Sequence, residues 1–316
     1  MQIYLPIAEI PINVLLILAL GLFTGFLAGM FGIGGGFLTT PFLMFIGISP
    51  AIAVATSANQ IVAASVSGLF AQLKKGGVDI KMGGFLLIGG FIGSTLGVSI
   101  FRVLQKSGDI DLVVGITYVL FLGSISTLML FDNIKMILSR KYQLSFEDDD
   151  DKKNKKCSAF FKKFLTKLDN LPYKIYFPKS GIEVSLIVPI ILSIGIGILV
   201  ALMGIGGGFL MIPAMIYILR MPSNVVVGTS LFQIIFIASN TTFLQAYSNK
   251  TVDIVLAFLL IISSSIGAQI GTRTGYRLDA DKMRSFLALL LFGVCFKIFL
   301  NLFTRPESLF VIEMLK

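Results

Sequence analysis

Long stretches without a charged residue constrain this chain more than any other feature. No Asp, Glu, Lys or Arg occurs from Ile10 to Leu73, and Val184–Asn249 is interrupted by Arg220 alone. A helix that crosses a bilayer needs about 20 apolar residues, so each stretch is long enough for about three crossings. This pattern predicts an integral membrane protein.

The composition excludes several classes of protein. The chain is 55% hydrophobic and 14% charged, whereas soluble globular domains carry roughly a quarter charged residues. A cytosolic enzyme, a secreted domain and a nucleic-acid-binding module are therefore excluded. The net charge of +9 is accordingly no sign of a nucleic-acid partner, and we expect the lipid bilayer to be the main surroundings of the chain.

The remaining apolar runs give the number of segments. They are Met82–Phe101, Leu112–Phe131, Val184–Leu219, Met221–Asn249, Ile254–Thr272 and Ser285–Thr304, the last of which contains Lys297. We predict an all-α integral membrane fold with about ten hydrophobic helical segments, five in each half. The segments that begin near glycine clusters are short, and we expect some of them to re-enter the membrane without crossing it.

The basic loops predict the orientation. Lysines and arginines gather at 74–81, in the long loop 139–182 and at 273–284, and basic loops face the cytoplasm. With five segments in each half, all three regions lie on one face, so the N-terminus is outside and the two halves are inverted relative to each other. The predicted units are a first membrane repeat (1–138), a charged cytoplasmic loop (139–182) and a second membrane repeat (183–316). An apolar stripe from Phe160 to Leu168 predicts a short helix at the membrane surface within that loop.

An internal repeat is the strongest motif. Gly32–Leu38 (GIGGGFL) reappears without change as Gly204–Leu210, and a proline follows each copy at the same spacing, Pro41 and Pro213. Further matches follow in the same order: Thr56-Ser57 with Gln60 and Thr229-Ser230 with Gln233, Asp79 and Asp253, and Gly93/Gly97 and Gly267/Gly271. Duplicated halves of opposite topology are typical of secondary transporters, whose binding sites lie at breaks in membrane helices.

The triple glycines predict such breaks. A helix that begins after a glycine tract offers free N–H groups and the positive end of its dipole, and bare glycine lets an anion approach them closely. We therefore predict one site for a small anion, formed by both tracts and by neutral polar side chains nearby. The candidate residues are Gly34, Gly35, Gly36, Thr39, Thr40, Ser57, Asn59, Gln60, Gly206, Gly207, Gly208, Ser230 and Gln233.

Structural interpretations stand beside this one. The glycines of the two tracts also suit close helix packing, as we expect for Gly25/Gly29, Gly93/Gly97 and Gly267/Gly271. The serines also suit hydrogen bonds to a carbonyl one turn earlier. We interpret Asp79 and Asp253 as caps at segment ends. An anion channel and a non-transporting membrane subunit remain open as alternative functions. The absence of histidine and of paired carboxylates in the apolar runs argues against an enzyme or a metal site, and we expect no cofactor. The oligomeric state is open.

These motifs resemble the TauE/SafE sulfite exporter family. The resemblance is carried by the duplicated glycine motif, the proline after it, and the blocks Ala55-Thr56-Ser57 and Gly228-Thr229-Ser230. It covers both membrane halves and leaves out residues 139–182. The resemblance implies a multi-pass permease of the bacterial inner membrane for sulfite or organosulfonates. Since an anion leaves a cell with the membrane potential, we expect export.

Overall fold

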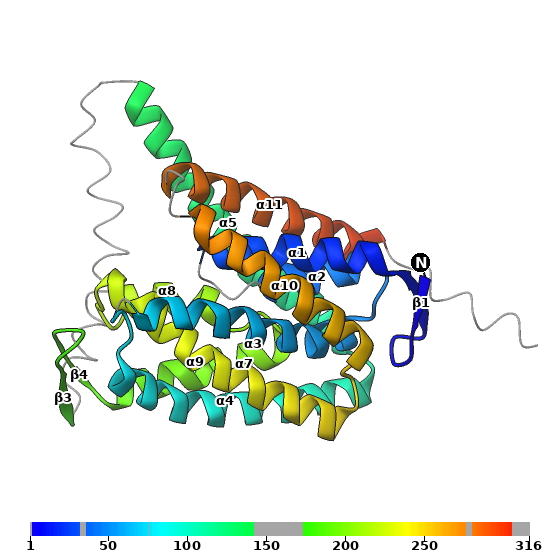
Figure 1. Ribbon diagram of the computed structural model, residues 1–316, viewed down its shortest axis with the longest axis horizontal. Helices are drawn as coiled ribbons and strands as arrows, with labels where there is room; N and C mark the ends of the chain where they lie inside the picture. The colour runs from blue at the N-terminus through cyan, green and yellow to red at the C-terminus, as the bar shows by residue number, and fades with distance from the viewer. Residues whose placement is uncertain (1, 32–35, 75, 142–172, 276–279, 305–316) are drawn as a thin grey trace, which may run out of the picture.

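The computed structural model of the protein describes residues 2–31, 36–74, 76–141, 173–275 and 280–304, and the same succession of helices occurs twice in it (Figure 1). The first half contains α1 (Val14–Phe31), α2 (Gly36–Phe45), α3 (Pro50–Lys74), α4 (Ile80–Ser107) and α5 (Ile110–Lys141). The second contains α7 (Ile187–Met203), α8 (Gly208–Tyr217), α9 (Ser223–Leu244) with the π-helix η1 (Gln245–Asn249), α10 (Ile254–Gly275) and α11 (Ala280–Thr304). The predicted all-α membrane fold is confirmed. Gly34, Gly35 and the predicted surface helix of the loop 139–182 lie outside the described residues.

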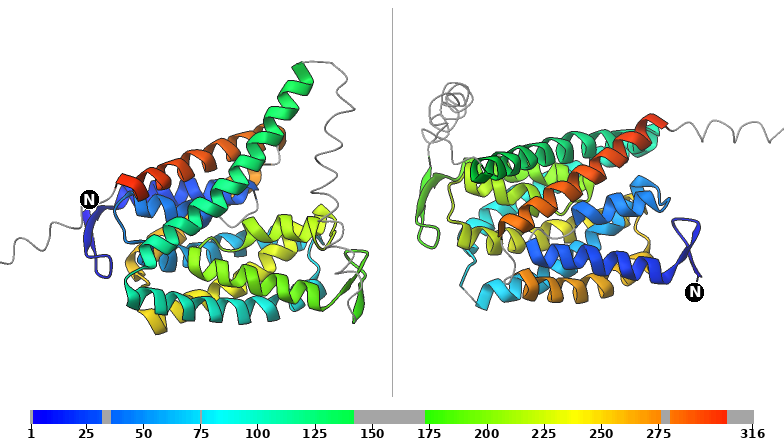
Figure 2. Two further views of the ribbon diagram at one scale, coloured as in Figure 1. Left: turned by 180° about the vertical axis from the view of Figure 1, so that it is seen from behind. Right: turned by 90° about the horizontal axis from the view of Figure 1, so that it is seen from above.

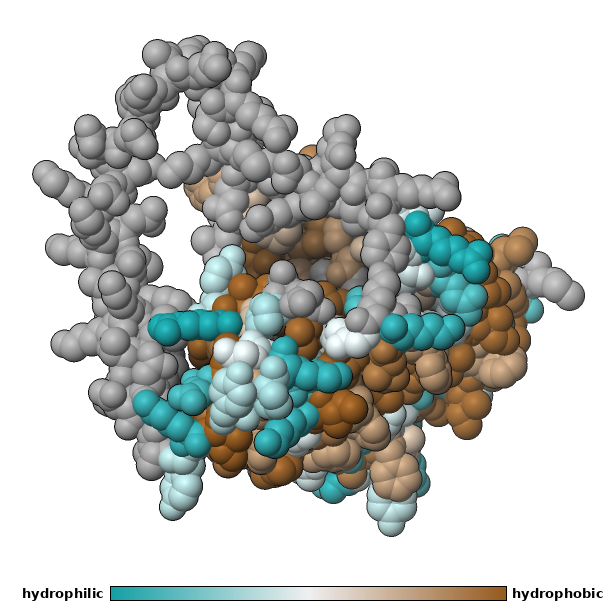
Figure 3. All heavy atoms as spheres, turned by 60° about the vertical axis from the view of Figure 1, so that its left-hand side comes forward, coloured by the Kyte–Doolittle hydropathy of each residue, from teal (hydrophilic) through white to brown (hydrophobic). Residues whose placement is uncertain are grey.

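The lengths of the helices fit the prediction from the apolar runs. Within the described ranges, 6 helices are long and apolar enough to cross a membrane, and α2 and α8 are among the shorter apolar helices. Both short helices directly follow a glycine tract, as predicted. Hydrophilic side chains gather at the end of the molecule seen in Figure 3, and hydrophobic side chains cover the flanks of the helices.

Two β-hairpins are a feature that the sequence analysis missed. Strand β1 (Gln2–Leu5) pairs antiparallel with β2 (Ile10–Asn13), and β3 (Lys174–Phe177) pairs antiparallel with β4 (Ile182–Ser185). The second hairpin crosses the predicted boundary between the loop and the second membrane repeat. The hairpins lie at opposite ends of the molecule (Figures 1 and 2).

The helices of the two halves are interleaved. At the centre α3 packs against α9, with α10 and then α1 on one side and α4 and then α7 on the other. Helix α5 packs against α11. Every one of these contacts between the halves either joins equivalent helices or has a counterpart in which the halves are exchanged. Their inverted orientation in a membrane stays a prediction.

Glycines allow the closest of these helix contacts. A Cβ atom on Gly25 or Gly29 of α1 would collide with the backbone of α10, at Ser264 and Ala268. On α4, a Cβ atom on Gly93 would collide with the carbonyl group of Ile194 in α7. The predicted role of these small residues as helix-contact surfaces is therefore confirmed.

Candidate functional site

The second glycine tract forms a break between α7 and α8. Gly204 ends α7 in the left-handed region with φ of 65°, and its N–H donates to the carbonyl oxygen of Val200 at 2.8 Å. Gly206 and Gly207 follow with φ of 81° and 74°. Residues with a Cβ atom rarely adopt the left-handed backbone conformation, and this segment adopts it at three of four consecutive positions. This explains why those three positions are glycine.

The break leaves backbone donors free. The carbonyl oxygen of Gly207 accepts from Leu210 and Met211 at the start of α8. Within the described part of the chain, the N–H groups of Ile205, Gly206 and Gly207 have no acceptor. These groups lie at the positive end of the α8 dipole, so they are able to bind an anion that reaches them.

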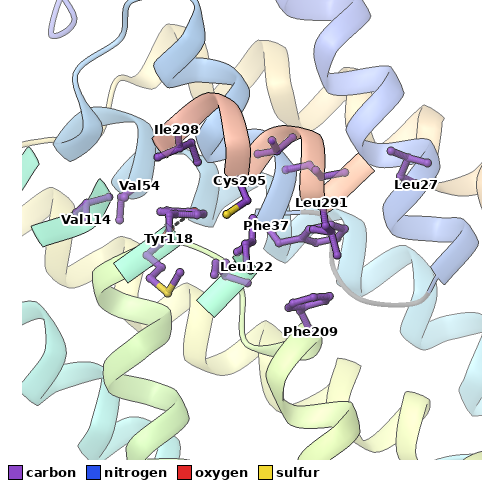
Figure 4. Packing of buried hydrophobic residues seen from close by; sticks show 14 of the residues in the cluster. Leu27, Phe37, Val54, Val114, Tyr118, Leu122, Phe209, Leu291, Cys295 and Ile298 are labelled. Atoms are coloured by element: carbon purple, nitrogen blue, oxygen red, sulfur yellow. Dashed lines mark hydrogen bonds between the residues drawn. The ribbon is translucent and has the colours of Figure 1, made fainter. Parts of the chain in front are cut away.

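The two predicted breaks meet. Of the first tract the structure describes Gly36, where α2 begins, and a Cβ atom there would lie 2.7 Å from the carbonyl oxygen of Gly204. Directly after each tract a phenylalanine follows, and the rings of Phe37 and Phe209 stack with centroids 5.1 Å apart and an interplanar angle of 13°. Figure 4 shows both rings in one apolar cluster with Leu291 of α11. The starts of α2 and α8 are thus neighbours across the contact between the halves.

Apolar side chains cover the break in this conformation. A Cβ atom on Gly206 would contact the side chain of Ile61 at 2.6 Å, and one on Gly207 would contact Val200 at 2.8 Å. Ile61 and Phe37 are fully buried. Access of any solute to the free N–H groups of the break would therefore require these side chains to move away.

The serine of each repeat holds backbone together. The Ser57 hydroxyl lies 2.7 Å from the Thr40 hydroxyl and within hydrogen-bonding distance of the carbonyl oxygens of Val54 (3.0 Å) and Gly204 (3.3 Å). It therefore links α3 to α2 and to the helix break of the other half. Ser230 donates to Val227 at 2.9 Å. Both serines bond to the preceding turn, as the structural interpretation predicted.

The two glutamines are buried in equivalent settings. The Gln60 amide nitrogen donates to the Thr24 hydroxyl at 2.8 Å, and that of Gln233 donates to the Ser193 hydroxyl at 2.6 Å. Since each hydroxyl donates its own proton to a helix carbonyl, it has to accept from the amide, which fixes the amide orientation. The free atom is the carbonyl oxygen Oε1 in both glutamines.

The predicted polar residues do not all converge. Gln60 points from α3 to α1, whereas Gln233 points from α9 to α7 and α4. Thr39 is fully buried, and the Asn59 amide nitrogen is buried without a hydrogen-bond partner among the described residues. The structure therefore brings together Gly36, Ser57 and the tract Gly204–Gly208, and places the glutamines on two different sides of the central helix pair.

Contacts made by the threonines of the repeat escaped the sequence analysis. The backbone N–H of Asp253 donates to Thr56 at 3.2 Å, and that of Asp79 donates to Thr229 at 2.9 Å. Each pair joins the two halves. The carboxylates cap the helices that follow, accepting from Leu256 at 3.1 Å and from Met82 at 3.0 Å. Their predicted role as caps is confirmed.

Each carboxylate also holds a hairpin. The second oxygen of Asp253 accepts from Ile7 and Ala8 in the turn between β1 and β2, at 3.0 and 3.4 Å. The second oxygen of Asp79 accepts from the Ser180 hydroxyl in the turn between β3 and β4, at 2.6 Å. A hydrogen-bonded path thus runs from each hairpin through an aspartate to α3 or α9. The sequence analysis missed a further repeat that lies in the two hairpins, Tyr4-Leu5-Pro6 and Tyr176-Phe177-Pro178. These two segments are as far apart in the sequence as the two glycine tracts.

Comparison with known proteins identifies the family of the chain. The family model "Sulfite exporter TauE/SafE" matches residues 17–298. Two relatives from Bacillus subtilis, the probable membrane transporter proteins YunE and YjnA, are each 26% identical to the chain; the alignments cover 87% and 86% of the chain and 93% and 94% of the relatives. A probable membrane transporter protein from Xylella fastidiosa is 26% identical over 82% of the chain and 83% of its own length. No solved structure matches the chain significantly. The chain is thus a multi-pass membrane transporter that belongs to the TauE/SafE sulfite exporter family.

Proposed function

We propose that the protein moves small sulfur-containing oxyanions, such as sulfite or organosulfonates, out of the cell across the bacterial inner membrane. The observation that carries this proposal is the meeting of the two helix breaks at Phe37 and Phe209, with free N–H groups in the tract Ile205–Gly207. Backbone amides suit a small, hard oxyanion and carry no fixed charge that would retain it. The name of the matching family supports the choice of sulfite among the anions.

The charged groups support outward transport. A negative-inside potential drives an anion outward by about 2.3 kcal/mol per charge per 100 mV, so export needs no coupling ion. Asp79 and Asp253 are buried carboxylates among the described residues, and both are engaged as helix caps and hairpin anchors. Both carboxylates therefore have a structural role in this conformation, and the proposal assigns no coupling ion to them.

The covered break supports a carrier. Ile61 and Val200 lie over Gly206 and Gly207, so binding requires a movement of α3 or α7 relative to the break. A carrier that opens to one side at a time needs a covered state of this kind, whereas a conducting channel needs an open path. Electrical currents far above carrier turnover would favour the channel.

Flux into proteoliposomes tests the proposal. We expect uptake of radiolabelled sulfite, with competition by a panel of organosulfonates. Gly207→Val places a side chain against Val200 and narrows the space beside the free N–H groups of the tract Ile205–Gly207. This variant should therefore abolish flux. Gly207→Ala should reduce it. The matched control is Gly195→Val in α7, because a Cβ atom at Gly195 has no neighbour within 4 Å. Flux at the wild-type rate in monodisperse Gly207→Val protein would refute the amide site.

A further inference from the structure

A cavity with a basic and polar lining lies at the carboxyl end of α4. Its volume is about 540 Å³, and it is lined by Arg102, Gln105 and Lys106 of α4 and by Ser248 and Asn249 of η1. All five side chains carry hydrogen-bond donors, and two of them carry a positive charge. We infer that this cavity binds a small oxyanion at one end of the transporter.

The guanidinium group of Arg102 is held in place. Its Nε donates to Oδ1 of Asn249 at 3.2 Å, and Nδ2 of Asn249 donates to Oε1 of Gln245. The Thr251 hydroxyl donates to the same Gln245 oxygen at 3.5 Å. Because Nε is engaged, the terminal nitrogens of Arg102 remain for a ligand. A guanidinium fixed in this way presents two donors in the geometry that an oxyanion accepts.

The buried layer behind Arg102 contains an unused donor. Gln245 is fully buried, and its amide nitrogen has no hydrogen-bond partner among the described residues. It begins the π-helix η1, a wider helical turn of a kind that often occurs at functional sites. The Gln245 carbonyl oxygen accepts from Asn249, so Gln245 acts on the cavity by holding the residue that holds Arg102.

Among the described residues, no acidic side chain pairs with the positive charges of the cavity. Neither Arg102 nor Lys106 forms an ion pair in the described ranges. Both are exposed near one end of α4, and Lys81 is exposed at the other. In the predicted topology the Lys81 end faces the cytoplasm, so Arg102 and Lys106 lie on the outer face, where basic residues are disfavoured. Binding of an anionic ligand explains two basic residues on the outer face, whereas the preference of basic residues for the cytoplasmic face does not.

The ligand that we assign is the transported oxyanion, and this assignment rests on the proposed function. The cavity lies at the end of the molecule that carries the β1–β2 hairpin (Figure 1). Positive charge at this end of the molecule raises the local concentration of anions. A lipid phosphate has the same chemistry, so the experiment has to separate the two sources.

Protection of Lys106 from acylation tests occupancy directly. We place the full-length protein in phosphatidylcholine nanodiscs and measure acylation of Lys106 and Lys81 by mass spectrometry. Sodium sulfate or sodium methanesulfonate is compared with sodium chloride at equal ionic strength. We expect both oxyanions to slow the labelling of Lys106 severalfold and to leave Lys81 unchanged. Arg102→Gln should remove this protection, and Asn249→Ala should weaken it.

Two outcomes would overturn the inference. Equal responses of Lys106 and Lys81 would mean that no oxyanion site exists in the cavity. Protection that appears with phosphatidylglycerol and not with sulfate would assign the cavity to a lipid headgroup.

Flux separates this inference from the proposed function. Arg102→Gln should raise the half-saturating sulfite concentration on the cavity side severalfold and leave the maximal rate unchanged, and the effect should shrink at high salt. The control Lys81→Gln removes the same charge at the other end of α4 and should change neither. If the wild-type protein carries no sulfur oxyanion while sulfate still protects Lys106, the proposed function fails and the anion site stands. Sulfite flux without protection of Lys106 would refute the anion site in the cavity and leave the proposed function standing.

Discussion

The backbone N–H of Asp253 donates a hydrogen bond to the hydroxyl oxygen of Thr56 over 3.2 Å, although the two residues belong to different halves of the chain. Asp79 and Thr229 make the same contact with the halves exchanged, over 2.9 Å. Each aspartate caps a helix and holds a hairpin, so each threonine supports an element at one end of the molecule. The next residue after Thr56, Ser57, reaches the carbonyl oxygen of Gly204 in the helix break. The end of the molecule that carries the β1–β2 hairpin and the candidate site are therefore connected through two adjacent side chains.

Thr56→Val tests the contact between Thr56 and Asp253. Valine keeps the shape of the side chain but leaves the buried Asp253 N–H without an acceptor, which costs about 1–3 kcal/mol. We expect a lower midpoint of thermal unfolding, measured in detergent by size-exclusion chromatography after heating. Thr127→Val on the exposed surface of α5, where the hydroxyl bonds to Gly123 of its own helix, is the control. Equal midpoints for the two variants would show that the hydrogen bond between Thr56 and Asp253 does not stabilise the protein.

The two aspartates should respond differently to replacement by asparagine. Asp253 accepts from backbone N–H groups on both oxygens, so Asp253→Asn turns an NH₂ group toward a donor and should cost about 2 kcal/mol. Asp79 accepts from Met82 on one oxygen and from the Ser180 hydroxyl on the other. A hydroxyl also accepts, so Asp79→Asn keeps both hydrogen bonds and should cost less than about 1 kcal/mol. Thermal unfolding of both purified variants gives the comparison, and the reverse order of stability would contradict these contacts.

The sequence predicted the elements of the fold better than their partners. Uncharged runs define membrane helices because a bilayer requires about 20 apolar residues, and the glycine tracts gave the short helices α2 and α8. Which helix packs against which depends on shape, and an apolar surface in lipid carries little information on its partner. The pairing of α1 with α10 and of α4 with α7 therefore became visible in the structure alone.

The candidate site was predictable in part for a related reason. The repeat identified Ser57, Gln60 and their counterparts, but a hydroxyl or amide bonds to protein or to ligand with the same chemistry. The structure reveals that Ser57 is engaged with backbone carbonyls and that the free atom of Gln60 is an acceptor. The hairpins were missed because strands of four residues give too short a pattern for periodicity to identify.

Glycine substitutions on α4 should have effects of opposite sign. A Cβ atom on Gly93 would collide with the carbonyl group of Ile194 in α7, so Gly93→Ala forces α4 and α7 apart and should destabilise the protein by about 1–3 kcal/mol. A Cβ atom on Gly84 has no neighbour within 4 Å. Gly84→Ala should stabilise α4 by about 0.5–1 kcal/mol, because alanine loses less backbone entropy than glycine. The midpoints of thermal unfolding should bracket that of the wild-type protein, and a stabilising Gly93→Ala would contradict the close contact.

A double-mutant cycle on Ser193 and Gln233 tests the orientation assigned to the buried glutamines. Ser193→Ala removes the acceptor of the Gln233 amide and should cost about 1–3 kcal/mol. Gln233→Leu removes the amide together with its unpartnered oxygen and leaves the Ser193 hydroxyl bonded to Leu86, so its cost should be smaller. Once the amide is absent, Ser193→Ala strands no donor. The double variant should therefore be more stable than the sum of the single effects implies, by about 1 kcal/mol.

The first half offers an independent copy of the same cycle. Thr24→Val removes the acceptor of the Gln60 amide, and Gln60→Leu removes that amide. Because the Thr24 hydroxyl donates to the carbonyl oxygen of Leu20 at 2.9 Å, it has to accept from the glutamine, and the coupling should have the same sign as in the second half. Free energies of unfolding for the wild-type protein, the single variants and the double variants give both couplings. Additivity within about 0.5 kcal/mol in both halves would mean that the amides do not donate to these hydroxyls. The assignment of Oε1 as the unpartnered atom of each glutamine would then be wrong.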